Sequence, residues 1–335
     1  MCLSNSQSEN KRLSYPSLGL KLRAFLWWNG TYAVTVALSL LFLFGPFLYP
    51  QTLGLFIVLP YFTYTIFLKR DELKQGSPWP IFSKKYPGII WLNKYLKLEF
   101  ATPPKKLVDL DNENNAQALF AVSPHGTACD YRISMDGLID TVVPNMAPNI
   151  RVLSASILFR LPVVREFSLW TNCVDARRSV AEGLLDANMS ILVIPGGMEE
   201  QLLTEHGKEI VYLTKRKGFV KLAMRKGVSI VPVYVFGSSD LFHTSNFLLA
   251  ARHWIMKNLK CCIPLTSGLF GSACPLPVKT TIVMGDPLTF RPKIGGQPTA
   301  DELDVAHKAY MTALTNLFNE HKERLGYADR ELEII

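Results

Sequence analysis

One short stretch of the chain combines the residue types of a general-base site. The apolar run from Ala118 to Val122 predicts a buried strand, and Pro124 ends it because proline cannot donate to a central ladder. His125 and Gly126 therefore follow the strand's end, where catalytic residues of open α/β sheets lie. Asp130 completes a His-x4-Asp spacing, and one helical turn would bring its carboxylate to the imidazole. The stretch predicts a base with an orienting acid, although a surface turn would carry the same residues.

A second predicted strand ends in glycines and carboxylates. The run 190–194 is fully apolar and leads into Pro195-Gly196-Gly197-Met198-Glu199-Glu200. If the two strands are parallel in one sheet, both loops open at the same edge. The N–H groups of Gly126, Gly196 and Gly197 would then supply an oxyanion site, and Glu200 is a second candidate to orient His125. A tight turn alone would also account for the glycine pair.

Basic residues follow two further predicted elements. Arg177 precedes a helix expected at 179–187, and Lys215 and Arg216 lie within a basic helix expected at 212–226. Arginine side chains and helix N-termini bind phosphate groups, so these three residues are candidate ligands of a phosphorylated cosubstrate. Solvated helix faces would explain the same charges, above all those later in the second helix.

The composition indicates a globular domain anchored to a membrane. Of the 335 residues 48% are hydrophobic, the net charge is +8 and the mean hydropathy is +0.14. The apolar stretch 25–44 is long enough to cross a bilayer core of about 30 Å. The stretch 53–68 is interrupted by Pro60 and is short for a full span. The pair predicts a hairpin that crosses and returns, or a re-entrant loop, with both outer ends in the cytosol.

Alternating strand and helix patterns after residue 118 predict an α/β fold with a mostly parallel sheet covered by helices. We expect a disordered cytosolic tail at 1–22, a membrane hairpin at 23–70 and one globular domain at 71–335. Amphipathic patterns predict helices on the membrane surface at 91–100 and 247–260. A further strand is expected at 280–284, and the last expected helix covers 300–324.

Several chemistries have no motif in this chain. It lacks a Gly-x-Ser-x-Gly elbow, a His-Glu-x-x-His pair, a phosphate-binding Walker loop and a dinucleotide fingerprint. The six cysteines show neither metal-ligand nor disulfide spacing, so we expect reduced thiols and no metal site. The basic charge does not sit on a recognisable nucleic-acid module, and we expect no nucleic-acid partner.

An ordered set of motifs resembles the type-2 diacylglycerol acyltransferase family, which includes monoacylglycerol and wax-alcohol acyltransferases. The matching stretches lie between residues 80 and 325. They are Pro124–Gly126, Leu161–Glu166, Pro195–Glu200, Arg216–Ala223, Val231–Gly237, Gly268–Phe270 and Val283–Pro287. The resemblance implies a glycerol-phosphate-acyltransferase-like domain. It also implies acyl transfer from acyl-CoA, as cosubstrate and without a further cofactor, to diacylglycerol, making triacylglycerol.

The resemblance also implies roles and a location. The family's histidine falls on His125, its acidic residue on Glu200 and its motif arginine on Arg177. The expected location is the endoplasmic reticulum membrane, with the catalytic domain facing the cytosol, and lipid droplets. We expect direct transfer with His125 as base and no acyl-enzyme intermediate.

Two departures from the family pattern keep alternatives open. Ser123 stands where the family usually has another histidine, and Asp130 gives the His-x4-Asp of glycerol-phosphate and lysophosphatidate acyltransferases. Lysophospholipid, monoacylglycerol and fatty-alcohol acceptors therefore remain, as does a non-catalytic lipid-droplet scaffold protein. The sequence leaves the oligomeric state open, a homo-oligomer included.

Overall fold

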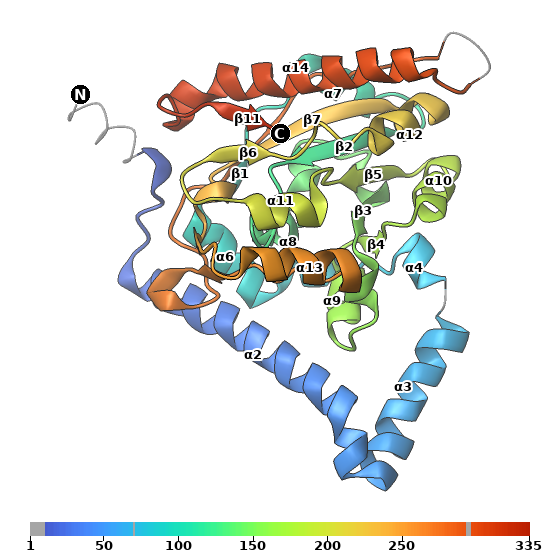
Figure 1. Cartoon of the computed structure of the whole chain (residues 1–335), viewed down its shortest axis with the longest axis vertical. Coiled ribbons are helices and arrows are strands. Elements are labelled where there is room, and N and C mark those ends of the chain that lie inside the picture. Colours follow the sequence, from blue (N-terminus) through green and yellow to red (C-terminus); the bar gives the residue numbers. More distant parts are fainter. Residues whose placement is uncertain (1–10, 70, 293–295) are drawn as a thin grey trace.

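A mixed sheet forms the centre of the protein (Figure 1). The computed structural model describes residues 11–69, 71–292 and 296–335. In this part of the chain the sheet has seven strands in the order β1-β10-β7-β2-β5-β3-β4. The five strands from β7 to β4 are parallel, whereas β10 is antiparallel to β7 and β1 is parallel to β10. Their bounds are Glu99–Phe100 (β1), Ala118–Ser123 (β2), Ile150–Ser154 (β3), Cys173–Asp175 (β4), Ser190–Val193 (β5), Ser229–Phe236 (β7) and Thr281–Met284 (β10). The predicted α/β fold with a mostly parallel sheet is confirmed.

Strand β2 separates two hydrophobic cores. All six of its residues are buried, as expected of a strand covered on both faces. Phe120 and Val122 belong to a core with residues of α2, α6, α8 and α9, whereas Leu119 and Ala121 belong to a core with residues of α10, α12 and α14. The bounds of these helices are Leu18–Leu48 (α2), Pro87–Leu96 (α6), Asp130–Met135 (α8), Val164–Trp170 (α9), Arg178–Asp186 (α10), Gly218–Lys226 (α12) and Ala300–Leu325 (α14).

Shorter elements connect these layers. The helices are Glu72–Gln75 (α4), Pro80–Lys85 (α5), Lys105–Asp111 (α7), Gly197–Leu203 (α11) and Leu249–Leu259 (α13). Strand β6 (Glu209–Val211) pairs in parallel with β11 (Leu332–Ile334), and β8 (His243–Thr244) pairs with β9 (Thr266–Ser267) in antiparallel fashion. Helix α14 begins with a capping box between Thr299 and Glu302 and ends at Gly326, which has φ +92°.

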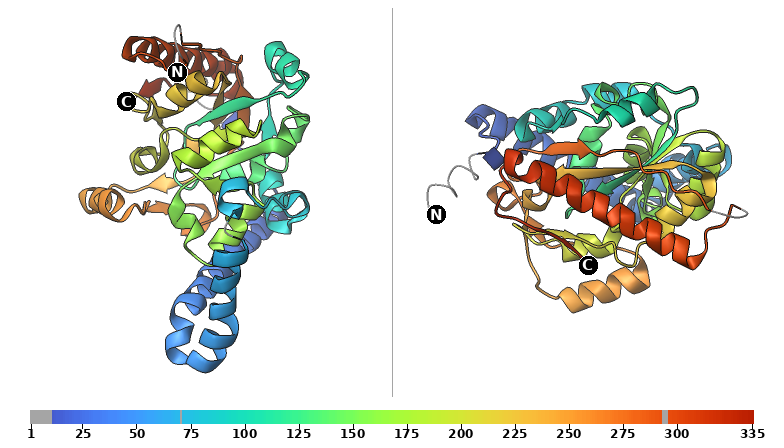
Figure 2. Two further views of the ribbon diagram at one scale, coloured as in Figure 1. Left: turned by 90° about the vertical axis from the view of Figure 1, so that its right-hand side faces the viewer. Right: turned by 90° about the horizontal axis from the view of Figure 1, so that it is seen from above.

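An apolar helical hairpin projects from the α/β body (Figures 1 and 2). Its first arm, α2, has 31 residues and is the one helix among the described residues that is long and apolar enough to cross a membrane. The second arm runs back from Pro50 to Leu68. It is π-helical at Pro50–Val58 and Tyr64–Leu68 and α-helical at Leu59–Thr63 (α3). Large apolar side chains of both arms are exposed, as a lipid-facing surface requires.

The start of α2 packs against the body, which fixes the hairpin's origin. Ala24 and Trp28 are buried in the core, and Asn29 donates to Ser272 Oγ at 3.2 Å and accepts from the Ala273 N–H at 3.2 Å. Further out, Ser39 Oγ donates to the Pro162 carbonyl at 2.8 Å. Asn29 and Ser39 of α2 therefore face the protein.

Four local predictions differ from the structure. The helix expected at 212–226 starts only at Gly218, because β6 and a turn precede it. The surface helix expected at 91–100 is α6, which ends at Leu96 and has Leu92, Tyr95 and Leu96 fully buried, because α2 covers it. The strand expected at 280–284 is present as β10, but it is antiparallel to its neighbour β7 in a mostly parallel sheet.

The fourth difference concerns the tail expected at 1–22, of which 1–10 lie outside the described residues. Leu13 bridges to Val278, and α2 already begins at Leu18. Residues 11–22 are thus part of the folded structure, because main-chain hydrogen bonds join Arg12 and Ser14 to the segment 277–279, just before β10.

Candidate active site

Three adjacent parallel strands end at one edge of the sheet, and their loops form the site. His125 and Gly126 follow β2, Gly196 and Gly197 follow β5, and Ser238 follows β7. A Cβ added to Gly126 would lie 3.4 Å from the Ser238 carbonyl oxygen, so the first and third loops touch. Gln201 Nε2 donates to the Thr127 carbonyl at 2.5 Å and links the first and second loops. The predicted convergence of His125 with the glycine pair is present.

One ring nitrogen of His125 is bonded to the main chain, and the other has no partner among the side chains that the structure describes, which do not include that of Asp130. Its Nδ1 lies 2.9 Å from the Gly126 carbonyl oxygen, which can only accept a hydrogen bond. In the neutral ring Nδ1 therefore carries the proton, and Nε2 keeps a lone pair. Burial lowers the pKa of His125 below 6.5, and the carbonyl contact opposes this only in part. The imidazole is thus neutral at physiological pH, as a general base must be.

Glu200 holds the backbone of His125 instead of its ring. Its carboxylate is fully buried in α11; Oε1 accepts from the His125 N–H and Oε2 from the Tyr212 N–H at 2.7 Å. The orientation of the imidazole by Glu200, which the sequence suggested, is therefore replaced by the Gly126 carbonyl. Desolvation raises the pKa of Glu200 from 4.5 to about 7, opposed by the two N–H donors and by Arg216.

The two glycines of the second loop have different structural reasons. A Cβ on Gly196 would overlap the carboxylate of Glu200, so this glycine makes room for the buried acid. Gly197 has φ +57°, which favours glycine. Its N–H donates to the Ile194 carbonyl at 3.2 Å and is therefore not available for the expected oxyanion role. The N–H groups of Gly126 and Gly196 have no acceptor among the described residues. These two remain candidate oxyanion donors.

For the acid of the His-x4-Asp pattern the structure describes the backbone alone. Asp130 starts α8, and its side chain lies outside the described residues, as does its expected contact with His125. The next residue, Tyr131, is buried and donates from its hydroxyl to the Pro124 carbonyl at 2.8 Å. Sequence reasoning missed Tyr131 and Gln201, because a supporting hydrogen bond to a main-chain carbonyl leaves no motif.

The predicted phosphate ligands lie along the same edge of the sheet. Arg216 is half-buried, donates to the Gly196 carbonyl at 3.3 Å and lies over the Tyr212 ring at 5.1 Å. Lys215, beside it, is exposed. Arg177 is exposed at the end of β4, with Nε 3.1 Å from Asp175. Because β4 is three strands from β2, Arg177 lies about 14 Å farther along the edge.

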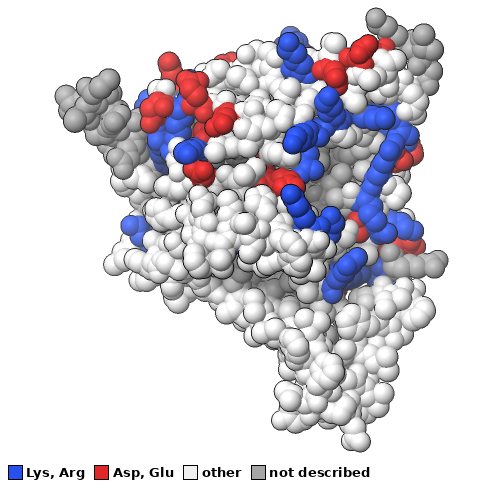
Figure 3. All heavy atoms as spheres, in the orientation of Figure 1, with Lys and Arg blue, Asp and Glu red and all other residues white. Residues whose placement is uncertain are grey.

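Figure 3 shows Lys and Arg side chains around a hollow on this face, in the region of α10, α11 and α12. The loop with Lys215 and Arg216 precedes α12, and Arg177 precedes α10. The arrangement places positive charge beside the histidine and at one end of an elongated surface, which suits a cosubstrate with phosphates at one end and a reactive group at the other.

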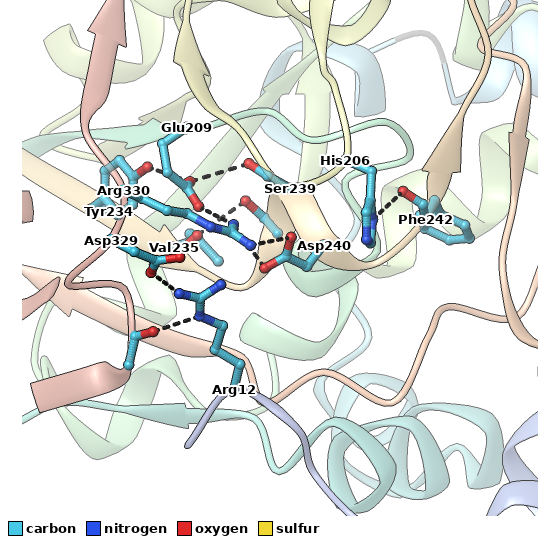
Figure 4. A network of polar contacts seen from close by, with 12 residues as sticks. Arg12, His206, Glu209, Tyr234, Val235, Ser239, Asp240, Phe242, Asp329 and Arg330 are labelled. Atoms are coloured by element: carbon cyan, nitrogen blue, oxygen red, sulfur yellow. Dashed lines mark hydrogen bonds and ion pairs between the residues drawn. The ribbon is translucent and has the colours of Figure 1, made fainter. Parts of the chain in front are cut away.

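A buried network of charged residues joins two segments that contact the site (Figure 4). Arg330 Nη1 lies 2.7 Å from Glu209 and 2.9 Å from Asp240, and Tyr234 donates to Glu209 at 2.8 Å. Burial, with Asp240 nearby, raises the pKa of Glu209. Glu209 lies on β6, just before Tyr212, and Asp240 lies just after Ser238. Arg330 therefore joins the two segments that contact Glu200 and Gly126, although it is 90 to 121 residues away from its partners in the chain.

Comparisons with known proteins agree with the motifs. The family model described as diacylglycerol acyltransferase matches residues 47–335. Diacylglycerol O-acyltransferase 2 of Bos taurus is 30% identical over 299 residues, which cover 82% of this chain and 78% of that protein.

Two further relatives are matched over smaller parts. The 2-acylglycerol O-acyltransferase 3 of Homo sapiens is 33% identical over 61% of this chain and 64% of that protein. Diacylglycerol O-acyltransferase 1 of Eremothecium gossypii is 30% identical over 65% of this chain and 50% of that protein. The chain thus spans about half to two thirds of the length of these two curated relatives.

Proposed function

The chain belongs to the diacylglycerol acyltransferase family, and on this premise we propose that it transfers a fatty acyl group from acyl-CoA to the hydroxyl of diacylglycerol. The product is triacylglycerol. The observation that carries the proposal is His125, with Nδ1 held by the Gly126 carbonyl and Nε2 without a partner among the described residues, at the edge where Arg216 meets the glycine loop. A base, N–H donors and a phosphate-binding cation are the groups that acyl transfer from a CoA thioester needs.

The proposed reaction is a direct transfer. Nε2 of His125 takes the proton of the acceptor hydroxyl as its oxygen attacks the thioester carbon. The N–H groups of Gly126 and Gly196 stabilise the oxyanion of the tetrahedral intermediate. The carbon–sulfur bond then breaks, and the CoA thiolate recovers the proton from the imidazolium. Glu200 acts as a positioning residue, because its contact is to the main chain of His125.

CoA is proposed to bind by its phosphates. Arg216 and Lys215 lie beside the glycine loop, and Arg177 lies farther along the same edge. The adenosine end of CoA would lie toward Arg177 and the thioester toward His125. The Asp175 carboxylate keeps the Arg177 side chain near the strand end until phosphate replaces it.

The hairpin supports a location at a membrane. The proposed membrane is that of the endoplasmic reticulum, with the catalytic domain in the cytosol, and lipid droplets are a second proposed location. Acyl-CoA and diacylglycerol both carry long apolar chains that partition into membranes, so an anchored site meets them there. The proposed division is a hairpin at 23–70 and an acyltransferase domain at 71–335. A site histidine after a central parallel strand favours a glycerol-phosphate-acyltransferase-like domain.

Monoacylglycerol is the second candidate acceptor. The human relative named 2-acylglycerol O-acyltransferase 3 is 33% identical, as is the human relative named diacylglycerol O-acyltransferase 2. Identity therefore does not separate these two acceptors.

The test is a parallel acceptor assay with the full chain in microsomes. Labelled oleoyl-CoA is supplied with diacylglycerol, monoacylglycerol, fatty alcohol or lysophosphatidate, and His125→Ala serves as the matched inactive control. We expect the highest turnover with diacylglycerol. Preference for another acceptor replaces the substrate assignment, and no transfer to any of them favours a scaffold protein.

A further inference from the structure

An exposed apolar segment lies apart from the hairpin and from the site. It comprises residues 247–265, with α13 at its centre, and is called here the α13 segment. Its exposed large apolar residues are Phe247, Leu248, Trp254, Leu259, Ile263 and Leu265. Trp254 is 61% exposed, whereas Arg252 and Met256 on the opposite side of the helix are buried. This is the pattern of a helix with one face on protein and one face free for an apolar partner.

The charges of the α13 segment have one sign. Lys257 and Lys260 are exposed, and neither forms an ion pair with a residue that the structure describes. The sequence from Leu241 to Gly285 contains no aspartate or glutamate. An apolar segment with cationic residues and no acids of its own is complementary to an anionic phospholipid surface.

The α13 segment is continuous with the root of the hairpin. Phe270, just beyond it, contacts the Phe25 ring at 5.8 Å, and Asn29 is hydrogen-bonded to Ser272 and Ala273. Trp27, next to these contacts on α2, is exposed, and tryptophan is typical of the membrane–water interface. The C-terminal end of the segment therefore leads to the place where α2 would leave the bilayer.

The direction of α13 agrees with this placement. Figures 1 and 2 show α13 near the level where the hairpin leaves the body, lying across the direction in which the hairpin projects. Figure 3 shows that charged side chains on this face gather above that level, whereas the hairpin below it carries almost none. A bilayer that contains the hairpin would thus have its surface beside α13.

We propose that the α13 segment is a second membrane contact, which lies on an anionic phospholipid surface with Trp254 and Leu259 in the interface. The inference rests on insertion of the hairpin. It has a consequence for the active site, because α13 packs on α11, which carries Glu200, and Cys262 Sγ lies 3.7 Å from the Met198 carbonyl. Membrane contact at α13 would hold the glycine loop close to the lipid acceptor.

Local fluorescence in vesicles tests the proposal with the full chain. A fluorescent non-canonical amino acid is placed, in separate proteins, at Trp254, at Phe56 on the hairpin and at Lys308 on α14. All three positions are exposed. The vesicles contain phosphatidylcholine and phosphatidylserine, some of it carrying a quenching nitroxide. We expect quenching at 254 and 56 and none at 308.

The outcomes separate the two ideas. Quenching at 56 without quenching at 254 overturns the α13 contact and leaves the hairpin in the membrane. No quenching at either position overturns the hairpin insertion and the α13 contact together.

Neutralising the lysines is the second arm. Lys257→Gln with Lys260→Gln should lower the equilibrium constant for membrane contact of the segment, read from quenching at 254, by about fivefold per lysine in vesicles with phosphatidylserine. In phosphatidylcholine alone the change should be small. Lys308→Gln is the matched control and should have no effect. Equal quenching at 254 in all of these cases would show that the surface charge has no part in the contact.

Discussion

The carboxylate of Glu200 accepts a hydrogen bond from the main-chain N–H of His125. The buried acid thus fixes where the histidine sits, while the Gly126 carbonyl fixes how its ring is turned. The two tasks that are often given to one carboxylate are divided between two groups.

The pH dependence of activity should contain a step that belongs to Glu200. Its pKa is about 7, and protonation turns one acceptor oxygen into a hydroxyl that faces an N–H donor. Activity should therefore rise as the pH increases through about 7, whereas protonation of His125 adds a step below 6.5. In Glu200→Gln we expect lower turnover at all pH values and no step near 7. Acyl transfer measured from pH 5 to 9 checks this, and an unchanged step in the variant would contradict it.

Stability should follow the opposite trend with pH. The pKa of Glu200 is raised on folding from 4.5 to about 7, so the folded protein binds this proton more tightly than the unfolded chain. The stabilisation from this group is complete below about 4.5 and is lost as the pH rises through about 7. Denaturant unfolding of the native protein and of Glu200→Gln should thus diverge across this interval. Parallel stability curves would show that the shift is absent.

Gly196→Ala should damage the site without a change of charge. The new methyl group meets the carboxylate of Glu200, which must move and leave the N–H groups of His125 and Tyr212 unpaired. Each unpaired buried donor costs about 1–3 kcal/mol, and turnover should fall with stability. Gly183→Ala in α10 is the matched control, because a Cβ there meets nothing within 4 Å. It should keep full activity and gain about 1 kcal/mol, as Ala exceeds Gly in helix propensity.

Arg330→Met should destabilise the protein by about 3–5 kcal/mol, because it leaves Glu209 and Asp240 buried without their cation. Arg330→Lys should recover part of that loss. Lys74→Met, which breaks an exposed pair with Asp71, is the control and should leave the unfolding midpoint unchanged. Thermal unfolding in detergent measures all three. Equal effects of the first and last substitutions would contradict the role of the network.

The cations beside the site should affect acyl-CoA and not the lipid. Arg177→Ala and Lys215→Ala should each raise the KM for acyl-CoA by about fivefold to tenfold and leave the KM for diacylglycerol unchanged. Lys221→Ala, an exposed change on α12, should alter neither. Initial rates with each substrate varied in turn give both constants. A rise in the diacylglycerol KM alone would place these residues on the lipid path instead.

The sequence predicted the parts of the fold that depend on local pattern. The apolar runs at 118–122 and 190–194 are buried parallel strands, and their proline and glycine ends bring His125 and the glycine pair together. Helix α14 was expected within one residue of its end, since its cap and period are encoded locally.

The contacts between distant segments could not be predicted in this way. Tyr212 donates to Glu200, and Arg330 joins Glu209 to Asp240 across 90 to 121 residues. No spacing in a single sequence records such pairs. The same limit explains why α6 was expected on the membrane surface: its amphipathic pattern suits that place, but α2 covers it. The contact of the His125 ring with the Gly126 carbonyl was missed because every residue possesses a main-chain carbonyl.

The most direct test of the central claim is acyl transfer by His125→Ala and His125→Gln in microsomes, with labelled oleoyl-CoA and diacylglycerol. Loss of the base should lower turnover by about 10²–10⁴-fold, while protein level and unfolding midpoint stay close to those of the native protein. Labelled triacylglycerol formed at the native rate by either variant would contradict the account.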